Sequence, residues 1–439
     1  MSEPVRVHTV SLGCPKNLVD TERLLGALGG AMTPVDEPKE ADLVLVNTCG
    51  FIQPAIEESV ETILDLVEEV REARESGKRQ PVMVVAGCLV SRFRDALRNE
   101  MPEVSLWLST DELDCWSDMI RDALGAETDK TMPRRVSTAP SFAYLKVGEG
   151  CSHNCRFCTI PSIRGPQHSF PLETLAAEAR LLVTSGVPEL VVVGQDSTAY
   201  GSDLGIKDGF RKLMDELLII EGLHWLRVMY LYPAGLSESN LKYLATMGRP
   251  FVPYFDIPLQ HAHPDILKNM GRPFSRDPQK VLERVKRFFP EAAIRTTFIV
   301  GFPGETEEHF HYLMDFVREH RLHHVGVFPY WPEEGTPAAE LPDQVPDDVK
   351  EARRDALMAL QAEISAELME EYVGQEIEIL VERPSPEWPG LYEGRAWFQA
   401  PEVDGKTYIS VPEGTELTPG TFVTAEVESA STYDLSVLL

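Results

Sequence analysis

Short apolar runs alternate with amphipathic stretches through residues 1–130. The runs Val5–Leu12, Asp42–Asn47 and Val82–Ala86 are rich in β-branched residues, which is typical of strands buried on both faces of a parallel sheet. Residues 54–73 place apolar side chains on one helical face and carboxylates on the other. This alternation predicts a domain at 1–130 built as an open parallel α/β sheet covered by helices.

A second series of apolar runs follows a polar stretch, residues 127–139, which predicts a linker. Helical patterns such as 172–185 and 305–320 separate these runs, and a long helical pattern at 346–372 closes the series. The expected strands are 142–147, 189–194, 225–231, 252–258, 294–301 and 323–329. Strands joined by long crossovers predict a partial (β/α)6 TIM-like barrel over residues 137–370, with its chemistry at the carboxyl ends of the strands.

The pattern changes again near residue 371, where residues alternate between apolar and polar and Pro, Gly and Asp punctuate the runs. The expected strands are 376–382, 392–399, 406–411, 421–427 and 435–439. Such short alternating strands predict a small all-β barrel over residues 371–439. The fold class expected for the whole chain is therefore α/β with a C-terminal all-β domain.

Composition narrows the class of protein. The longest apolar runs fall short of the ~18 residues that a membrane span needs. The N-terminal residues lack a charged segment followed by an apolar one, so we expect a cytoplasmic protein without a membrane partner. Seven cysteines in 439 residues are too few for a disulfide scaffold and indicate metal binding or catalysis.

Cys151, Cys155 and Cys158 lie close together in the stretch GEGCSHNCRFCTIP, directly after the first strand of the second series. Thiolates are the preferred ligands of iron–sulfur clusters, and three of them leave one iron of a cluster open to another ligand. The alternative is structural zinc, which needs four ligands. His153 is the only nearby fourth candidate, so the spacing favours a cluster.

Cys14, Cys49 and Cys88 are far apart in the sequence, yet each follows a predicted strand, in VSLGC, LVNTC and VVAGC. Parallel strands present their carboxyl ends on one edge of a sheet, so three loops can bring these thiols together. We expect a second three-cysteine cluster with one open iron. The alternative is three unrelated buried cysteines, which are common in protein cores. Cys115 follows no strand and is interpreted as structural.

The CxxxCxxC spacing, with the aromatic Phe157 before its last cysteine, resembles the radical S-adenosylmethionine superfamily. The resemblance implies a 4Fe-4S cluster whose open iron holds S-adenosylmethionine and whose reduction yields a 5′-deoxyadenosyl radical. Gly301–Glu305 (GFPGE) is similar to the turn that approaches this cofactor, which makes Gly301, Gly304 and Glu305 candidate contacts. Phe157 is a further candidate contact of the cofactor. The alternative for GFPGE is an ordinary βα turn.

Two three-cysteine sets followed by a small β-barrel resemble the methylthiotransferases along essentially the whole chain. The matching segments are Gly13–Glu22, Asn47–Phe51, Gly194–Gly201, Asp256–Pro264 and Phe298–Glu307. The resemblance implies an N-terminal methylthiotransferase domain, a radical domain and a C-terminal TRAM domain. The branch that modifies transfer RNA typically has Gln-Met at Pro15–Lys16, Asn at Asp196 and Ser-Gly at His261–Ala262. This sequence is instead similar to the branch that modifies an aspartate of the twelfth small-subunit ribosomal protein.

The family resemblance also implies a mechanism and a set of cofactors. Two 4Fe-4S clusters, S-adenosylmethionine and an external electron donor would together replace a hydrogen on the β-carbon of the target aspartate with a methylthio group. An unactivated C–H bond requires a radical, which explains why no paired-carboxylate or Ser/His/Asp arrangement is needed. Asp196, His261 and His263 follow predicted barrel strands and are candidates for the substrate pocket. Ordinary loop residues are the alternative for each.

Charge favours a protein substrate. The formal net charge is -29, and residues 371–439 alone carry thirteen carboxylates against three basic side chains. Nucleic-acid binding gains affinity from Lys and Arg, which the C-terminal domain almost lacks, so nucleic acid is an unlikely direct substrate. An acidic surface complements a basic ribosomal protein. The alternatives are a transfer-RNA methylthiotransferase and, in another class, a non-enzymatic iron–sulfur scaffold or carrier.

Overall fold

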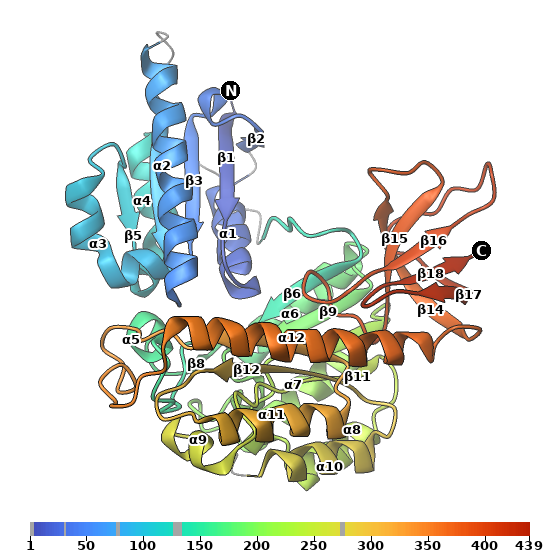
Figure 1. Ribbon diagram of the computed structural model, residues 1–439. Coiled ribbons are helices and arrows are strands. Elements are labelled where there is room, and N and C mark those ends of the chain that lie inside the picture. Colours follow the sequence, from blue (N-terminus) through green and yellow to red (C-terminus); the bar gives the residue numbers. More distant parts are fainter. Residues whose placement is uncertain (1–3, 30–31, 76–79, 126–133, 273–276) are drawn as a thin grey trace. The chain divides into compact units, whose positions relative to one another are not determined.

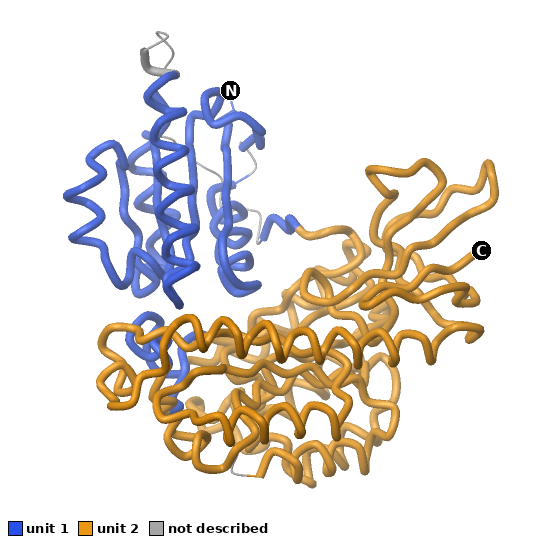
Figure 2. Tube along the Cα trace, viewed as in Figure 1, with its two compact units in different colours: residues 1–137, 149–153, 158–167 blue, residues 138–148, 154–157, 168–439 orange. Residues whose placement is uncertain are grey.

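The computed structural model describes residues 4–29, 32–75, 80–125, 134–272 and 277–439. The chain forms two compact units, coloured separately in Figure 2. The first unit contains residues 1–137 together with 149–153 and 158–167, and the second contains the remainder. None of the described helices is long and apolar enough to cross a membrane.

The first unit contains a five-stranded sheet in the order β2-β1-β3-β4-β5, with parallel pairing throughout (Figure 1). The strands are β1 (Val5–Ser11), β2 (Met32–Pro34), β3 (Leu43–Thr48), β4 (Val82–Gly87) and β5 (Leu106–Leu108). The helices are α1 (Pro15–Leu28), α2 (Gln53–Glu75), α3 (Cys88–Glu100) and α4 (Trp116–Leu124). The three strands expected from the sequence are confirmed. The edge strands β2 and β5 were missed because three residues are too few to show a period.

Both faces of this sheet are buried. On β3, Val44 and Val46 pack against α2 and α3, whereas Leu43 and Leu45 pack against α1 and α4. All four side chains are fully buried. Successive residues of a strand point to opposite faces, so a continuous apolar run is the pattern that a doubly covered sheet requires.

The boundary between the two units, Ser137–Thr138, falls within the predicted linker 127–139, and the described part of this linker contacts α1. The Arg134 guanidinium bonds the buried carboxylate of Glu22 on α1, with an Nε–Oε2 distance of 2.8 Å. Ser137 donates its backbone N–H to the other oxygen of Glu22 at 2.6 Å. This segment is therefore anchored to α1, although its polar composition resembles that of a linker. The earlier residues, 127–133, lie outside the described ranges.

The second unit contains a six-stranded parallel sheet in the order β13-β12-β11-β10-β9-β6, which confirms the partial barrel. Its strands are β6 (Phe142–Lys146), β9 (Glu189–Val193), β10 (Trp225–Val228), β11 (Phe251–Asp256), β12 (Ala293–Val300) and β13 (His324–Pro329). Its helices are α6 (Leu172–Thr184), α7 (Gly209–Leu218), α8 (Glu238–Ala245), α9 (Pro264–Asn269), α10 (Pro278–Phe288), α11 (Glu307–His320) and α12 (Asp347–Glu370). The last of these, α12, runs lengthwise along the barrel beside β13 (Figure 1).

A short excursion follows β6 and carries the CxxxCxxC cysteines. It comprises β7 (Gly148–Glu149), α5 (Ile160–Arg164) and β8 (His168–Ser169), and β7 pairs with β8. The pairing returns the chain to the barrel after the cysteine loop. Sequence periodicity could not predict strands of two residues.

The C-terminal residues form a closed five-stranded barrel in the order β14-β15-β16-β18-β17, as predicted. The strands are β14 (Glu376–Pro384), β15 (Leu391–Ala396), β16 (Thr407–Ser410), β17 (Phe422–Ala430) and β18 (Leu435–Leu438). The segment from Arg395 to Asp404 contacts several strands of the larger barrel. For example, Tyr254 of β11 donates its hydroxyl to Asp404 at 2.6 Å, and His324 of β13 lies 2.7 Å from the carbonyl oxygen of Phe398.

Glu189 is the centre of this contact. Its two carboxylate oxygens bind two different arginines, Arg227 of β10 at 2.7 Å and Arg395 of β15 at 2.6 Å. All three side chains are almost completely buried. Burial alone would raise the pKa of Glu189, but Arg395 and Arg227 lower it, so the carboxylate is ionised. Glu382 pairs with Arg395 at 2.7 Å, so two arginines and two carboxylates join the barrels with balanced charge.

We expect Glu189→Gln to destabilise the second unit by about 3–5 kcal/mol, because it leaves two buried arginines without their shared counter-charge. Chemical denaturation followed by circular dichroism measures the change. The control is Glu387→Gln, an exposed carboxylate of the small barrel, which should change stability by less than about 0.5 kcal/mol. Equal effects from both variants would contradict the central role given to Glu189.

Candidate functional site

Three cysteines lie at the carboxyl edge of the first unit's sheet. Cys14 follows β1 by three residues, Cys49 directly follows β3, and Cys88 directly follows β4 and begins α3. These three strands are neighbours in the sheet. The sequence-based placement of each cysteine at a strand end is therefore confirmed.

Glycines next to the cysteines let the three loops approach one another. A Cβ on Gly13 would lie 3.0 Å from the sulfur of Cys49, and a Cβ on Gly50 would lie 2.7 Å from the backbone of Leu89, beside Cys88. Gly87 has a φ of 102°, and a Cβ there would lie 2.3 Å from the side-chain oxygen of Asn47. Larger residues at these positions would push the cysteine loops apart.

A buried asparagine ties the same loops together. Asn17 donates from Nδ2 to the carbonyl oxygens of Leu12 and Thr48, each at 3.0 Å, which fixes the chain just before Cys14 and Cys49. Asn47 donates to the carbonyl oxygen of Asn17 at 2.8 Å. The hydroxyl of Thr48 donates to the carbonyl oxygen of Ala86 at 2.6 Å, which connects the loop after β3 with the end of β4.

The thiols differ in acidity. Burial raises the pKa of Cys49 to about 12, and the neighbouring Cys88 and Cys14 add to the rise. Burial likewise raises the pKa of Cys88, against the charge of Arg164. Burial opposes the ionisation of Cys14, yet the charges of Lys16 and Arg164 lower its pKa overall. Without a metal, three thiolates so near one another repel, and a bound metal would hold all three deprotonated.

The donor set fits an iron–sulfur cluster. The site offers three sulfur ligands, of which Cys88 is buried and Cys14 and Cys49 are half-buried, from three loops that glycines hold in close approach. Three sulfur ligands suit a 4Fe-4S cluster with one open iron, whereas a structural zinc ion requires a fourth ligand. Cys115 does not belong to this set, because it ends a 3-10 helix and its side chain is exposed.

The second cysteine set lies on the loop that follows β7. The backbone N–H of Cys151 donates to the carbonyl oxygen of Gly165 at 3.1 Å, and the N–H of His153 points at the sulfur of Cys151 at 3.4 Å. Gly150 has a φ of 63°, and a Cβ there would lie 2.2 Å from the carbonyl oxygen of Pro166. The two ends of the loop, Gly150–Cys151 and Gly165–Pro166, thus lie side by side. Its last cysteine, Cys158, is half-buried.

Cys155 lies beside a buried arginine of the second unit. The Nη1 atom of Arg272 is 3.6 Å from the Cys155 sulfur, and its Nη2 donates to the carbonyl oxygen of Pro258 at 2.6 Å. The guanidinium also stacks over the ring of Tyr232, 4.6 Å from its centroid. Phe157 packs against the apolar cluster that contains Met270 and Phe302. Its contacts in this structure are therefore those of a core residue.

The GFPGE turn after β12 contains two glycines with positive φ, and they differ in surroundings. A Cβ on Gly301 would lie 2.2 Å from the side chain of Lys350, so the lack of a side chain at Gly301 allows α12 to pack closely against the turn. A Cβ on Gly304 would meet nothing within 4 Å, so only Gly304 borders open space that a cofactor could enter. Glu305 is buried, accepts the Gly301 N–H at 2.9 Å and pairs with Arg353 at 3.0 Å. Its carboxylate holds the turn in shape.

Asp196 and His261 both follow barrel strands, β9 and β11, at the carboxyl end. Asp196 accepts the N–H of Thr198 at 2.9 Å, which begins a short 3-10 helix. His261 is fully buried, and its Nε2 lies 3.5 Å from Glu305, which connects the loop after β11 with the GFPGE turn. Gln260, the residue before it, has a φ of 73°, an uncommon backbone for a residue with a side chain.

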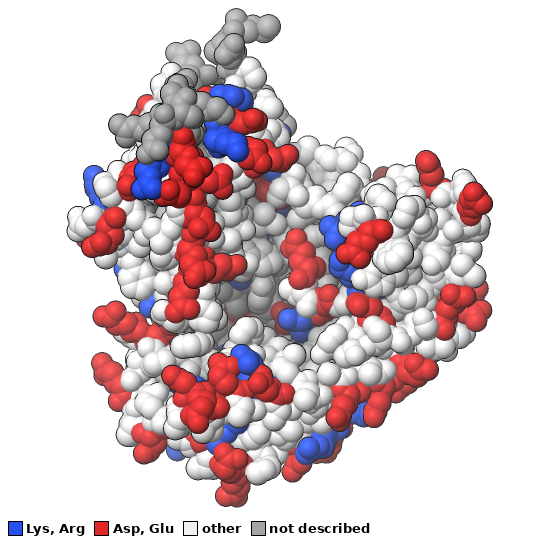
Figure 3. All heavy atoms as spheres, turned by 45° about the horizontal axis from the view of Figure 1, so that its top comes forward, with Lys and Arg blue, Asp and Glu red and all other residues white. Residues whose placement is uncertain are grey.

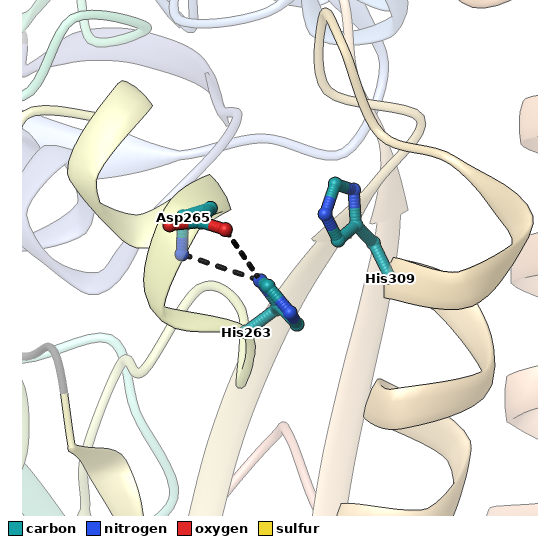
Figure 4. Close-up of side chains that lie close together, drawn as sticks. All are labelled: His263, Asp265 and His309. Carbon is teal, nitrogen blue, oxygen red and sulfur yellow. Dashed lines mark hydrogen bonds and ion pairs between the residues drawn. The ribbon is translucent and has the colours of Figure 1, made fainter.

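His263 lies next to His309 and Asp265 (Figure 4). The three side chains place ligand atoms within 4.8 Å of one another, which is close enough for a metal ion. However, the Nδ1 of His263 accepts the N–H of Asp265 at 3.2 Å, and the Nδ1 of His309 accepts the N–H of Thr306 at 3.1 Å. Burial and the neighbouring His309 lower the pKa of His263 and favour this neutral form. The pair caps α9 and α11, so a metal would have to break those caps.

Three residues that contact the cysteines or position their loops were not predicted from the sequence: Asn17, Arg164 and Arg272. Asn17 lies within Gly13–Glu22, a segment that resembles the methylthiotransferases, but no role was predicted for it. An isolated arginine in a sequence is usually a solvated surface residue, so nothing marked Arg164 or Arg272 as buried. The assignment of Asp196, His261 and His263 to a substrate pocket, and of Phe157 and the GFPGE residues to cofactor binding, stays a prediction.

We expect Asn17→Ala to lower the iron content of the anaerobically reconstituted protein from about eight to about four atoms per chain, because the loops of Cys14 and Cys49 lose their common hydrogen-bond donor. Iron and sulfide analysis measures the change. Asn99→Ala, at an exposed position of α3, is the control and should retain the full content. Retention of about eight iron atoms in Asn17→Ala would contradict this role.

Three family descriptions match the chain. The Radical SAM superfamily matches residues 145–317, the uncharacterized protein family UPF0004 matches residues 6–109, and the TRAM domain matches residues 373–438. Membership of the first implies a 4Fe-4S cluster and S-adenosylmethionine as cofactors.

Among solved structures, the radical S-adenosylmethionine methyltransferase TsrM from Kitasatospora setae, with tryptophan and a cofactor analogue bound, is similar in fold. It aligns with a TM-score of 0.53 at 14% identity over 89% of this chain and 78% of that one. The cobalamin-dependent radical enzyme OxsB aligns with a TM-score of 0.52 at 11% identity, over 82% of this chain and 56% of that one. At these identities the likeness concerns the fold alone.

Curated relatives match at much higher identity. The ribosomal protein uS12 methylthiotransferase RimO of Oleidesulfovibrio alaskensis is 55% identical over 99% of this chain and 100% of its own length. The protein of the same name from Aquifex aeolicus is 43% identical over 98% of this chain and 96% of its own. The chain therefore belongs to the RimO family of ribosomal protein uS12 methylthiotransferases, a branch of the radical S-adenosylmethionine enzymes.

Proposed function

We propose that this chain transfers a methylthio group to the β-carbon of an aspartate in ribosomal protein uS12, acting in the cytoplasm. It would use two 4Fe-4S clusters, each held by three cysteines. Cys151, Cys155 and Cys158 would hold the radical cluster, at which S-adenosylmethionine would bind. Cys14, Cys49 and Cys88 hold the second, here named the auxiliary cluster.

The observation that carries this proposal is the arrangement of Cys14, Cys49 and Cys88 at the ends of three neighbouring strands, with glycines at each point of close approach. A radical enzyme that only removes hydrogen has no need of a second three-sulfur site. A second cluster with an open iron gives sulfur a place to bind before transfer. The names of the curated relatives support the same reaction.

The chain's own residues position and shield this chemistry. When bound, the two clusters and S-adenosylmethionine supply the radical that activates the C–H bond and the sulfur that replaces its hydrogen. Gly304 leaves space for the cofactor beside the GFPGE turn, while Glu305 and Arg353 keep that turn rigid. Such fixed surroundings limit side reactions of a radical. An external electron donor would supply the electron for the cleavage of S-adenosylmethionine.

A basic protein is the substrate class that the C-terminal barrel favours. Figure 3 shows carboxylates on the face of this barrel that is in view, at the right. Glu376 of β14 lies directly opposite Glu426 of β17, and Glu428 follows on the same strand. All three are exposed. Like charges opposite each other destabilise a sheet, so this acidic strip costs stability that a cationic partner would recover.

The reaction can be tested with the anaerobically reconstituted full chain and purified uS12. We expect wild-type protein to release 5′-deoxyadenosine and to add the mass of a methylthio group to uS12. Cys151→Ala should abolish both products. Cys14→Ala should abolish the methylthio product but retain cleavage of S-adenosylmethionine, because the radical cluster remains.

Two outcomes would reject the proposal in favour of its alternatives. A protein that holds iron but never cleaves S-adenosylmethionine under reduction is a scaffold or carrier. Modification of transfer RNA with no change in uS12 would indicate a transfer-RNA methylthiotransferase. Mass spectrometry of uS12 from a strain without this gene provides the independent check, and persistence of the methylthio mass there would also reject the assignment.

Neutralising the acidic strip should weaken docking while it stabilises the barrel. We expect the triple variant Glu376→Gln, Glu426→Gln and Glu428→Gln to bind uS12 more weakly, most clearly at low salt, and to unfold at a higher temperature. The control removes the same charge from exposed positions of α2, with Glu58→Gln, Glu61→Gln and Asp65→Asn. Equal affinity of both triple variants would reject docking at the strip. Biolayer interferometry and differential scanning calorimetry supply the two readings.

A further inference from the structure

Arg164 is a buried cation at the auxiliary cysteines. It is the last residue of α5 and follows Cys158 by six positions, yet its side chain is only 1% exposed. A buried guanidinium without partners costs several kcal/mol. The burial of the Arg164 guanidinium must therefore be explained by its partners.

The guanidinium uses all three of its nitrogens. Nη1 lies 2.7 Å from Glu149 and 3.2 Å from Asp20, and Nη2 bonds the side-chain oxygen of Asn17. Nε points at the sulfur of Cys88 at 3.3 Å. The two carboxylates thus neutralise the charge at Nη1, while Nε is directed at the Cys88 sulfur.

A cysteine sulfur is a suitable target for this donor only when it carries negative charge. A neutral thiol is a weak acceptor, whereas a thiolate accepts a charged donor strongly. The Nε–sulfur distance of 3.3 Å places this donor where it would bond the Cys88 sulfur when a cluster binds that sulfur as a thiolate.

Arg164 also connects the two cysteine sets. Glu149, whose two oxygens both accept from Nη1, precedes Cys151 by two residues, so the ion pair closes the base of the loop that carries the radical cysteines. The hydroxyl of Thr110 donates to the carbonyl oxygen of Ile163 at 2.6 Å and holds α5 to the first unit. One side chain therefore touches the auxiliary site and the base of the radical loop together.

We propose that Arg164 is a positioning residue of the auxiliary cluster, which holds the Cys88 sulfur by a hydrogen bond and makes the cluster easier to reduce. The inference rests on the proposed two-cluster function. One-electron reduction adds a negative charge to the cluster, and a cation beside a ligand sulfur stabilises that charge. Loss of the guanidinium should shift the reduction potential to more negative values.

The test uses the full-length chain with Cys151, Cys155 and Cys158 replaced by alanine, so that only the auxiliary cluster assembles. Potentiometric titration with dithionite and redox mediators, followed by electron paramagnetic resonance, gives its potential. We expect Arg164→Met in this background to hold about four iron atoms per chain and to titrate at a more negative potential.

Arg272→Met is the matched control, because Arg272 is the buried arginine beside Cys155 of the other set. In the auxiliary-only background it should leave the potential unchanged. In the reciprocal background, with Cys14, Cys49 and Cys88 replaced by alanine, Arg272→Met should shift the potential of the radical cluster and Arg164→Met should not.

An unchanged auxiliary potential in a fully loaded Arg164→Met protein would overturn the proposal. If that variant binds no iron, Arg164→Gln replaces it, and an unchanged potential there has the same meaning. The positioning role is supported if both Arg164 variants fail to load the auxiliary cluster in this background but still assemble the radical cluster when all six ligand cysteines are present. Failure of the auxiliary-only parent to bind iron would instead reject the two-cluster function itself.

Discussion

Neighbouring parallel strands end on the same edge of a sheet, and the chemistry of this chain depends on that constraint. Cys14, Cys49 and Cys88 are far apart in sequence but follow adjacent strands, so the sheet brings their loops together. Close approach then requires small residues, which Gly13, Gly50 and Gly87 supply. The candidate residues of the barrel, Asp196 and His261 among them, follow its strands in the same way. The positions of reactive groups are thus fixed by backbone pairing rather than by local motifs.

Buried polar groups determine how the loops and domains are held. Asn17 bonds the chain before two of the cysteines, Glu22 anchors the segment after residue 133, and Glu189 joins the two barrels. Each is almost fully buried, and each binds partners far away in the sequence. Breaking such contacts is costly because the remaining partner stays buried without compensation. These few side chains therefore specify arrangements that apolar packing alone would leave variable.

The sequence allowed prediction of the elements whose pattern is long enough to be periodic. All six barrel strands and the five strands of the C-terminal barrel were expected, as was the strand before each of Cys14, Cys49 and Cys88. Elements of two or three residues, such as β2 and β7, have no period to detect. The partners of polar residues could not be predicted either, because the sequence does not distinguish a buried arginine such as Arg164 from a solvated one. The contacts of residues 134–137 with Glu22 were hidden for the same reason, since these polar groups find their partners only in the folded protein.

The C-terminal barrel lies at the amino end of the larger barrel, whose candidate chemistry lies at the carboxyl end. The longest strand between these ends, β12, has eight residues and therefore measures about 26 Å. Asp404 of the small barrel already pairs with Arg295, the third residue of β12, so the remaining distance to the carboxyl end is shorter than the whole strand. Under the proposed function, a partner that docks on the small barrel would have to extend along the larger barrel before its aspartate reached that end.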